Sequence, residues 1–330
     1  RRSSDDALKS FTADEVTDGT LLAFVNTPTN GVFANTGYES FTNASASGFT
    51  ASNTGSTGFA VSDILDGVSG DSVSVSFDID ITNGSPSISL RTVIDGGSTA
   101  SNSATYTSSG SKTATLTANK GYVGIGFTEG DAPSNFTVSN FKIIADGFVK
   151  TWYDQSVTTE AGDTATGNHA VQGTAGSQPK IVNAGTLLTA GVTFDGDDSL
   201  SVSGEPVITA SSSGVYSAFS VQTVATTSEA GYLYGNASSS NGSSLYAAAS
   251  TFTLTNKNVA TLDNLSRSSG QNLLSAVYNN GDAGLLVNGA GTMTDTGTYD
   301  FSAGSSDFII GNRNGGTSAG TFLTGSINEI

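Results

Sequence analysis

One stretch of the sequence constrains the fold more than any other. Residues 72–81 read Ser-Val-Ser-Val-Ser-Phe-Asp-Ile-Asp-Ile, with polar and apolar residues in strict alternation. Successive side chains of a β-strand point to opposite faces, so this pattern indicates a strand with one face in a core and the other in water. A turn sequence follows at 83–85, and the alternation resumes at Ile88, Leu90 and Thr92. These residues predict antiparallel strands.

The composition of the chain agrees with an all-β fold. Among 330 residues there are 41 Gly, and only 12% are charged, which suits short strands joined by tight turns and disfavours helix. The 17 Phe and 10 Tyr recur between the turn signals, so a packed fold is expected rather than disorder. The length suffices for two domains that each bury a core, and without Cys their stability does not rest on disulfides.

The charge balance restricts the partners. A formal net charge of −17 offers no general attraction to nucleic acid or anionic lipid, which both need a basic face, whereas neutral glycans or cations suit it better. No apolar run approaches the roughly 20 residues of a membrane span, so none is expected. The chain starts at Arg1 without Met and ends in an alternating run at 325–330, from which we expect an excerpt of a longer polypeptide.

The predicted strands fall into two sets. The first, between residues 27 and 145, includes 72–81, 88–92, 113–117, 122–127 and 136–144, a spacing typical of a jelly-roll-like sandwich. The second begins at 146 and includes 149–153, 192–194, 217–222, 273–278, 284–287 and 308–311, which again predicts a sandwich. Residues 1–26 hold an apolar patch at 21–25 and a short helix-capable piece at 5–9, too little for a domain of their own.

Three islands in the second set carry a family resemblance. They are a Trp-Tyr-Asp-Gln-Ser run at 152–156 followed by Gly-Asn-His-Ala at 167–170, a Phe-Asp-Gly-Asp-Asp-Ser-Leu run at 194–200, and Gly311 leading to 325–329. Together they resemble the concanavalin A-like, laminin-G-like lectin fold. With the Arg-Arg-Ser-Ser-Asp-Asp run at 1–6, the island at 152–156 is similar to the catalytic domain of α-L-arabinofuranosidase B and to its relatives in phage and bacterial surface proteins.

The resemblance implies a discontinuous domain. In those relatives the arginine-serine island and the Tyr-Asp-Gln-Ser island lie close in sequence, whereas here residues 7–151 separate them. We therefore expect two β-sandwiches: a concanavalin A-like jelly roll made of residues 1–26 and 146–330, truncated at its C-terminus, and a smaller sandwich of residues 27–145 inserted into one of its loops. The insert is similar to carbohydrate-binding jelly rolls of phage tails and glycanase accessory modules.

The resemblance does not extend to catalysis. A retaining glycosidase needs two carboxyl groups about 5 to 5.5 Å apart. In the arabinofuranosidase family the nucleophilic Glu lies in a Gly-His-Met-Glu-type stretch, and the matching region here, 232–236, has no Glu. The disulfides of that family are also missing. We therefore expect no enzyme and assign no catalytic residue, with a secreted arabinofuranosidase-like glycoside hydrolase, or its accessory module, as the alternative.

Two groups of residues are candidates for binding. Oxygen-rich loops can hold Ca²⁺, so the cluster of Asp195, Asp197 and Asp198 is either a calcium site or a polar turn between strands. Candidate glycan contacts are Asp154 and Gln155, which serve alternatively to bond backbone donors of a loop, and the surface tyrosines Tyr232, Tyr234 and Tyr246.

Two residues that occur once in the chain are assigned structural roles. His169 is the only histidine, which excludes a multi-histidine metal site and favours a loop role. Trp152 is the only tryptophan and is expected in the core.

These features predict a virion or cell-surface structural or adhesion protein. The expectation is a phage capsid decoration, fibre or tail component that binds glycans or a host-surface polysaccharide weakly and multivalently, with other virion or surface proteins as partners and oligomerisation or attachment to a particle. A bacterial adhesin of the same architecture is a further alternative, because fold does not imply function. The expected location is the virion surface or the extracellular space.

Overall fold

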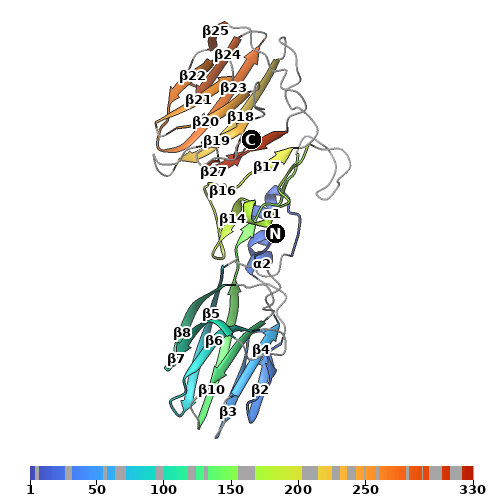
Figure 1. Ribbon diagram of the computed structural model, residues 1–330, viewed down its shortest axis with the longest axis vertical. Helices are drawn as coiled ribbons and strands as arrows, with labels where there is room; N and C mark the ends of the chain where they lie inside the picture. Colours follow the sequence, from blue (N-terminus) through green and yellow to red (C-terminus); the bar gives the residue numbers. More distant parts are fainter. Residues whose placement is uncertain are drawn as a thin grey trace. The chain divides into compact units, whose positions relative to one another are not determined.

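The computed structural model of the chain describes residues 1–3, 7–26, 32–54, 58–63, 72–93, 100–117, 124–129, 133–154, 168–202, 215–224, 231–235, 243–248, 250–256, 260–279, 282–291, 293–296, 307–312 and 322–329. The described chain is mostly antiparallel β-strand (Figure 1), so the predicted all-β class is confirmed. It divides into two compact units. Unit 1 comprises Arg1–Phe148 and Val182–Leu187, and unit 2 comprises Val149–Ile181 and Leu188–Ile330.

Unit 1 contains a sandwich of two five-stranded sheets, with strand orders β1-β4-β9-β6-β7 and β2-β3-β10-β5-β8. The alternating run at 72–81 forms β5, as predicted. The strands are β1 (Ala34–Asn35), β2 (Ser40–Ser45), β3 (Gly48–Asn53), β4 (Gly58–Asp63), β5 (Ser72–Asn83), β6 (Ile88–Val93), β7 (Ala100–Tyr106), β8 (Gly110–Thr117), β9 (Gly124–Glu129) and β10 (Ser134–Ile144).

The core of this sandwich is built from phenylalanines that the two sheets contribute. Phe127 of β9 is fully buried, and its ring centroid lies 5.2 Å from that of Phe77 in β5 and 5.7 Å from that of Phe49 in β3. Edge-to-face pairs of this kind add about 0.5–1.5 kcal/mol each to the stabilisation from burial. The alternation of β5 therefore places its apolar face against the aromatic face of the opposite sheet.

The helices of unit 1 lie elsewhere than predicted. Residues 7–10 have no regular structure, and the helices are α1 (Ala13–Thr17) and α2 (Thr20–Asn26). Thr12 starts α1 with a capping box: the backbone N–H of Glu15 donates to its Oγ1, and its own N–H donates to Oε2 of Glu15. The cap places the start of the first helix after Thr12. The helix-forming piece predicted at 5–9 is therefore not helical in its described residues, 7–9.

Residues 1–26 pack against the chain that follows β10. Arg2 is buried, donates from Nη1 to the carbonyl oxygen of Phe24 (2.6 Å) and lies over the Phe24 ring. The N–H of Ser3 donates to the carbonyl oxygen of Asp146 (2.9 Å). Nδ2 of Asn26 donates to the carbonyl oxygen of Gly185 (2.9 Å). Within unit 1, the two chain segments that flank residues 27–145 are thus held together.

The bounds of the units differ from the predicted domains in the placement of residues 1–26, which fall in unit 1 with β1–β10. Unit 1 also contains the short strands β11 (Gly147–Phe148) and β15 (Thr186–Leu187). β14 (Lys180–Asn183) has its first two residues in unit 2 and its last two in unit 1. An insertion of 27–145 into a discontinuous domain stays a proposal.

Unit 2 is a second sandwich. One sheet runs β14-β16-β27-β18-β23-β24-β25, and the other runs β12-β13-β17-β26-β19-β20-β21-β22. A 3-10 helix, η1 (Ala175–Ser177), precedes β14. The other elements are β12 (Thr151–Trp152), β13 (Ala170–Val171), β16 (Val192–Asp195), β17 (Leu200–Val202), β18 (Val215–Val224), β19 (Gly231–Gly235), β20 (Ser243–Ala247), β21 (Thr251–Asn256), β22 (Ala260–Ser266), β23 (Gly270–Asn279), β24 (Asp282–Val287), β25 (Met293–Thr296), β26 (Phe308–Ile310) and β27 (Thr324–Glu329).

The core of unit 2 lies between these sheets. Phe194, Leu233 and Phe252 are buried in it, and Trp152 packs against it with part of its surface exposed, in agreement with the core role predicted for this residue. The prediction of two β-sandwiches is therefore confirmed.

Candidate functional site

Three aspartates converge in the turn between β16 and β17, which we call the aspartate turn (residues 195–198). Asp195 ends β16, whose partner is β27 in one sheet, and Leu200 opens β17, whose partner is β26 in the other sheet. The turn therefore carries the chain from one sheet of unit 2 to the other. One carboxylate oxygen from each of Asp195, Asp197 and Asp198 lies within 4.8 Å of the others.

The three carboxyl groups differ in environment. Asp195 and Asp197 are exposed, whereas Asp198 is only 4% exposed. Burial, together with the charge of Asp195, raises the pKa of Asp198 to about 7. A hydrogen bond with the Asp195 side chain, followed by burial, raises the pKa of Asp197. The turn thus holds a carboxyl group that binds a proton near neutral pH because its negative charge is poorly solvated and repelled.

The backbone of the aspartate turn is held in one conformation by its neighbours. Oδ2 of Asp198 accepts the N–H of Asp195 at 3.1 Å, which closes the turn. Gly196 has φ of +111°, a conformation that favours glycine. Gly311, after β26, packs directly on the Phe194 ring, and an added Cβ there would lie 3.2 Å from the carbonyl oxygen of Asp198. The position of Asp198 is therefore fixed by its neighbours.

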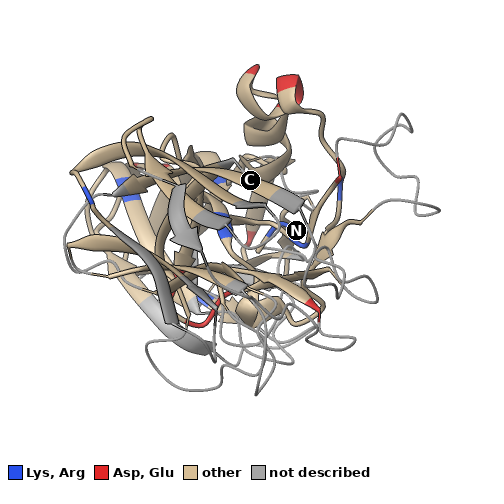
Figure 2. Ribbon diagram, turned by 90° about the horizontal axis from the view of Figure 1, so that it is seen from above, with Lys and Arg blue, Asp and Glu red and all other residues tan. Residues whose placement is uncertain are grey.

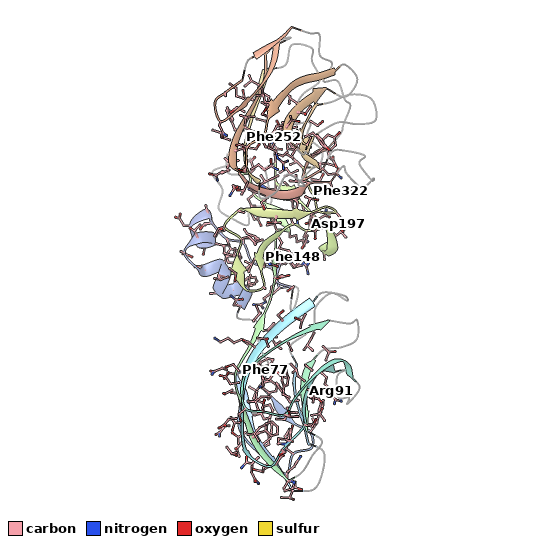
Figure 3. The ribbon with its side chains drawn as sticks, turned by 90° about the vertical axis from the view of Figure 1, so that its left-hand side faces the viewer. Phe77, Arg91, Phe148, Asp197, Phe252 and Phe322 are labelled. Carbon is pink, nitrogen blue, oxygen red and sulfur yellow. The ribbon has the colours of Figure 1, made fainter. Side chains whose placement is uncertain are left out.

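The oxygen set suits a hard divalent cation. Calcium takes oxygen ligands at about 2.4 Å, so two ligands on opposite sides of the ion are at most about 4.8 Å apart. The three carboxylates of the aspartate turn meet this limit. Figure 3 labels Asp197, one of the three. A cation there would also offset the charge of Asp195, which contributes to the raised pKa values of Asp197 and Asp198. Within the described residues this is the one cluster of carboxylate, imidazole or thiol groups with such spacing.

The predicted tyrosines separate into two groups. Tyr232 of β19 and Tyr246 of β20 are direct cross-strand partners, both are half-buried, and their ring centroids lie 4.9 Å apart. Their neighbours Leu233 and Leu245 face the core, so the tyrosine pair lies on the outer face of the sheet.

Tyr234 was expected on the surface and is instead buried, with 1% exposure. The register between β19 and β20 shifts between Tyr232 and Tyr234, an irregularity that turns Tyr234 toward the core beside Phe308.

Asp154 ties two segments of a loop together. Its Oδ2 accepts the N–H of Asn168 (3.2 Å), and its own N–H donates to Nδ1 of His169 (3.0 Å), whose ring stands edge-on to Tyr153. These contacts match the loop-pinning alternative for Asp154 and the loop role predicted for His169. Gln155 lies outside the described residues.

Sequence reasoning missed two glutamines that support the residue after the aspartate turn, Gln172 directly and Gln178 through Gln172. Nε2 of Gln172 donates to the carbonyl oxygen of Ser199 (3.0 Å), and Nε2 of the buried Gln178 donates to the carbonyl oxygen of Gln172 (3.0 Å). Glutamines between two strands carry no local pattern that would single them out, and only the fold brings them next to the turn.

The described surface is sparsely charged, and most of the ribbon in Figure 2 belongs to neither charge class. Helices long and apolar enough to cross a membrane do not occur among the described residues.

Comparisons with known proteins give a likeness among solved structures. No family model matches the sequence, and no curated protein matches it. Among solved structures, the chain is similar to domains LG4-5 of the mouse laminin α1 chain, with 13% identity and a TM-score of 0.33 over 80% of this chain and 82% of that chain.

Proposed function

We propose that this chain is an extracellular, non-catalytic binding module that contacts glycans through the Tyr232–Tyr246 pair of unit 2. The observation that carries this proposal is that pair: two half-buried rings, 4.9 Å apart, on the outer face of a sheet. A tyrosine ring offers an apolar face for the C–H face of a sugar and a hydroxyl for its polar rim. Thr253, the cross-strand partner of Tyr246 in β21, adds a hydroxyl beside the rings.

Calcium in the aspartate turn is the proposed structural cofactor. The turn joins the two sheets of unit 2, so a cation held by Asp195, Asp197 and Asp198 would stabilise the sandwich that carries the tyrosines. The tyrosines belong to β19 and β20, and the aspartates to a different connection. A structural calcium is therefore expected to affect stability more strongly than the sugar contact itself.

We assign no hydrolysis to the chain. A glycosidase requires two carboxyl groups, one of them a proton donor with a raised pKa, and the pKa of Asp198 in the aspartate turn is raised. Asp198 is buried, however, and its Oδ2 already accepts the N–H of Asp195, so this carboxyl group, whose pKa is about 7, does not reach outward to a glycosidic oxygen. This burial favours binding over a secreted arabinofuranosidase-like activity.

The setting of the proposed module is a virion or a cell surface. A phage decoration, fibre or tail protein presents many copies, and multivalency lets individually weak sites hold a surface firmly. A net charge of −17 opposes nonspecific adhesion to nucleic acid and anionic membranes. A bacterial adhesin would use the same sites in the same way.

The test is a glycan-array screen of the purified protein in Ca²⁺ and in EDTA, with a reducing-sugar assay on every glycan bound. Tyr246→Ala is the informative variant. Phe219→Ala is its matched control, because Phe219 is an aromatic residue on β18 of the other sheet with 58% exposure.

We expect binding without release of sugar, lost in Tyr246→Ala and kept in Phe219→Ala. Binding that survives Tyr246→Ala would remove the tyrosine pair from the site. Release of sugar would establish the hydrolase alternative, and silence on all glycans would contradict glycan binding as the function.

A further inference from the structure

The outer face of the β1-β4-β9-β6-β7 sheet of unit 1 carries a cation, Arg91, that has no partner among the described residues. Arg91 lies in β6 between Leu90 and Thr92, which are both fully buried, so its side chain points away from the core (Figure 3). Its Nε is buried with no hydrogen-bond partner. Within the described part of the chain, the Arg91 side chain makes no hydrogen bond or ion pair.

An unpartnered guanidinium of this kind is energetically unfavourable. A buried donor without an acceptor is destabilising, and more so when the group is charged. Guanidinium groups pair most strongly with planar anions that accept two parallel hydrogen bonds. The geometry therefore leaves Arg91 ready for an external anion.

Strand register places Arg91 beside an open position. In the row that crosses the sheet, Arg91 of β6 pairs with Gly126 of β9, which pairs in turn with Val61 of β4. Gly126 has no side chain, so this row of the sheet carries no side chain between Arg91 and Val61. A ligand that reaches the guanidinium from this direction meets backbone and an apolar side chain rather than a competing charge.

The adjacent row supplies hydroxyl groups and an aromatic ring. Phe59 of β4, Thr128 of β9, Ser89 of β6 and Thr105 of β7 are successive cross-strand partners. Oγ1 of Thr128 is buried without a hydrogen-bond partner, and Oγ of Ser89 lies 3.2 Å from Oγ1 of Thr105. The row thus offers a half-buried aromatic ring at one end and two paired hydroxyl groups at the other.

We infer that this face binds an acidic glycan, with Arg91 pairing with the anionic group of one sugar and the Phe59–Thr105 row contacting the sugar ring and hydroxyls. A cation, hydroxyl groups and an aromatic ring on one face of a sheet match the anionic group, the hydroxyls and the ring of an acidic sugar. The inference rests on the proposed glycan-binding function, and it names the ligand class and a second site, in unit 1.

The net charge of the chain sets the form of the test. At −17 the protein repels long polyanions, so a short oligosaccharide at about 0.15 M salt, where the Debye length is about 8 Å, isolates the local contact. The probe is trigalacturonate, with a sulfated trisaccharide and a neutral galactose trisaccharide for comparison. Binding to the full chain is measured by isothermal titration calorimetry.

Arg91→Gln is the test variant, because it removes the charge and keeps most of the side chain. Lys142→Gln is the matched control: Lys142 is an exposed cation on β10 in the other sheet of the same sandwich, and its loss changes the net charge equally. We expect Arg91→Gln to weaken trigalacturonate binding at least tenfold and Lys142→Gln to change it less than twofold. Unchanged circular dichroism in Arg91→Gln verifies that the sheet remains folded.

The outcomes separate this inference from the proposed function. Equal binding of trigalacturonate by Arg91→Gln and the unaltered chain overturns the inference. If the neutral trisaccharide binds through Tyr246 and neither trigalacturonate nor the sulfated trisaccharide binds, the acidic-glycan site is refuted while glycan binding by unit 2 stands. Binding of the sulfated probe in place of trigalacturonate, lost in Arg91→Gln, supports the site and identifies sulfate as its anion. Failure of all three probes contradicts the inference.

Discussion

Replacing Asp198 by Asn isolates the cost of a buried charge in the aspartate turn. The pKa of Asp198 rises from its ordinary value of 3.8 to about 7, and one pKa unit corresponds to about 1.36 kcal/mol. Ionising this group above pH 7 therefore costs the folded state up to about 4 kcal/mol relative to the unfolded chain. Asn has the same shape, and its Oδ1 can accept the N–H of Asp195 that Asp198 accepts at 3.1 Å. In EDTA at pH 8, Asp198→Asn should raise the free energy of unfolding of unit 2 by up to this amount.

The effect has a defined pH dependence. Because the pKa is higher in the folded state than in the unfolded state, folding takes up a proton between about pH 4 and pH 7. The stability of the unaltered protein should therefore fall as the pH rises through this window. This pH dependence should be absent in Asp198→Asn, which cannot take up the proton. Below pH 4 the two proteins should differ little, since Asp198 is protonated in both states.

Trp152 provides the assay, because it is the only tryptophan and packs against the core of unit 2. Urea unfolding followed by its fluorescence reports on unit 2 alone. Asp80→Asn, an exposed position in β5, is the control for a lost charge. Parallel stability curves for the unaltered chain and Asp198→Asn between pH 4.5 and pH 8 would refute the reasoning.

Calcium should reduce the stability difference between the unaltered chain and Asp198→Asn. A ligand that binds only the folded state at one hundred times its dissociation constant adds about 2.7 kcal/mol of stability. Ca²⁺ at pH 8 is therefore expected to stabilise the unaltered chain and to have little effect on Asp198→Asn. At pH 5 the proton competes with the cation at Asp198, and the stabilisation should shrink. Equal stabilisation of both proteins by Ca²⁺ would remove the aspartate turn as its site.

Two further predictions concern the fold. Phe127→Ala should destabilise unit 1 by about 3–5 kcal/mol in calorimetric unfolding, because Phe127 is fully buried among aromatic rings. The control, Phe219→Ala on an exposed face, should change stability by less than about 0.5 kcal/mol. A loss below about 1 kcal/mol in Phe127→Ala would contradict the aromatic core. Gly231→Ala should destabilise unit 2 by about 2 kcal/mol or more, measured by urea unfolding followed by Trp152 fluorescence, because φ of Gly231 is +128° and an added Cβ would overlap the backbone of Phe322. Gly173→Ala is the control, because an added Cβ there meets open space. Equal stability of the two variants would contradict this geometry.

The alternating runs allowed the strands to be predicted, while registers and irregularities were not predictable. The run at 72–81 forms β5 because period-2 alternation leaves one geometry that buries the apolar face. Tyr234 shows the limit of this reasoning: the shift in register beside Tyr232 turns its ring inward, and such an irregularity depends on the partner strand β20. The helices were misplaced for a different reason, since the cap at Thr12 is a local signal that the apolar patch at 21–25 obscured.

The candidate sites divide in the same way. The three aspartates are nearly consecutive, so the sequence alone indicated a place for a cation, but the burial of Asp198 depends on β16, β17 and the contact of Gly311 with Phe194.

Arg91 gave no sequence signal of function. Its significance comes from Gly126 and Thr128, which reach the same face only through the pairing of β6 with β9. The alternation of polar and apolar residues along one strand determines which side chains face water, because successive side chains of a strand point to opposite faces. Which of them meet on one face is decided by long-range pairing, because residues distant in sequence contribute the neighbours.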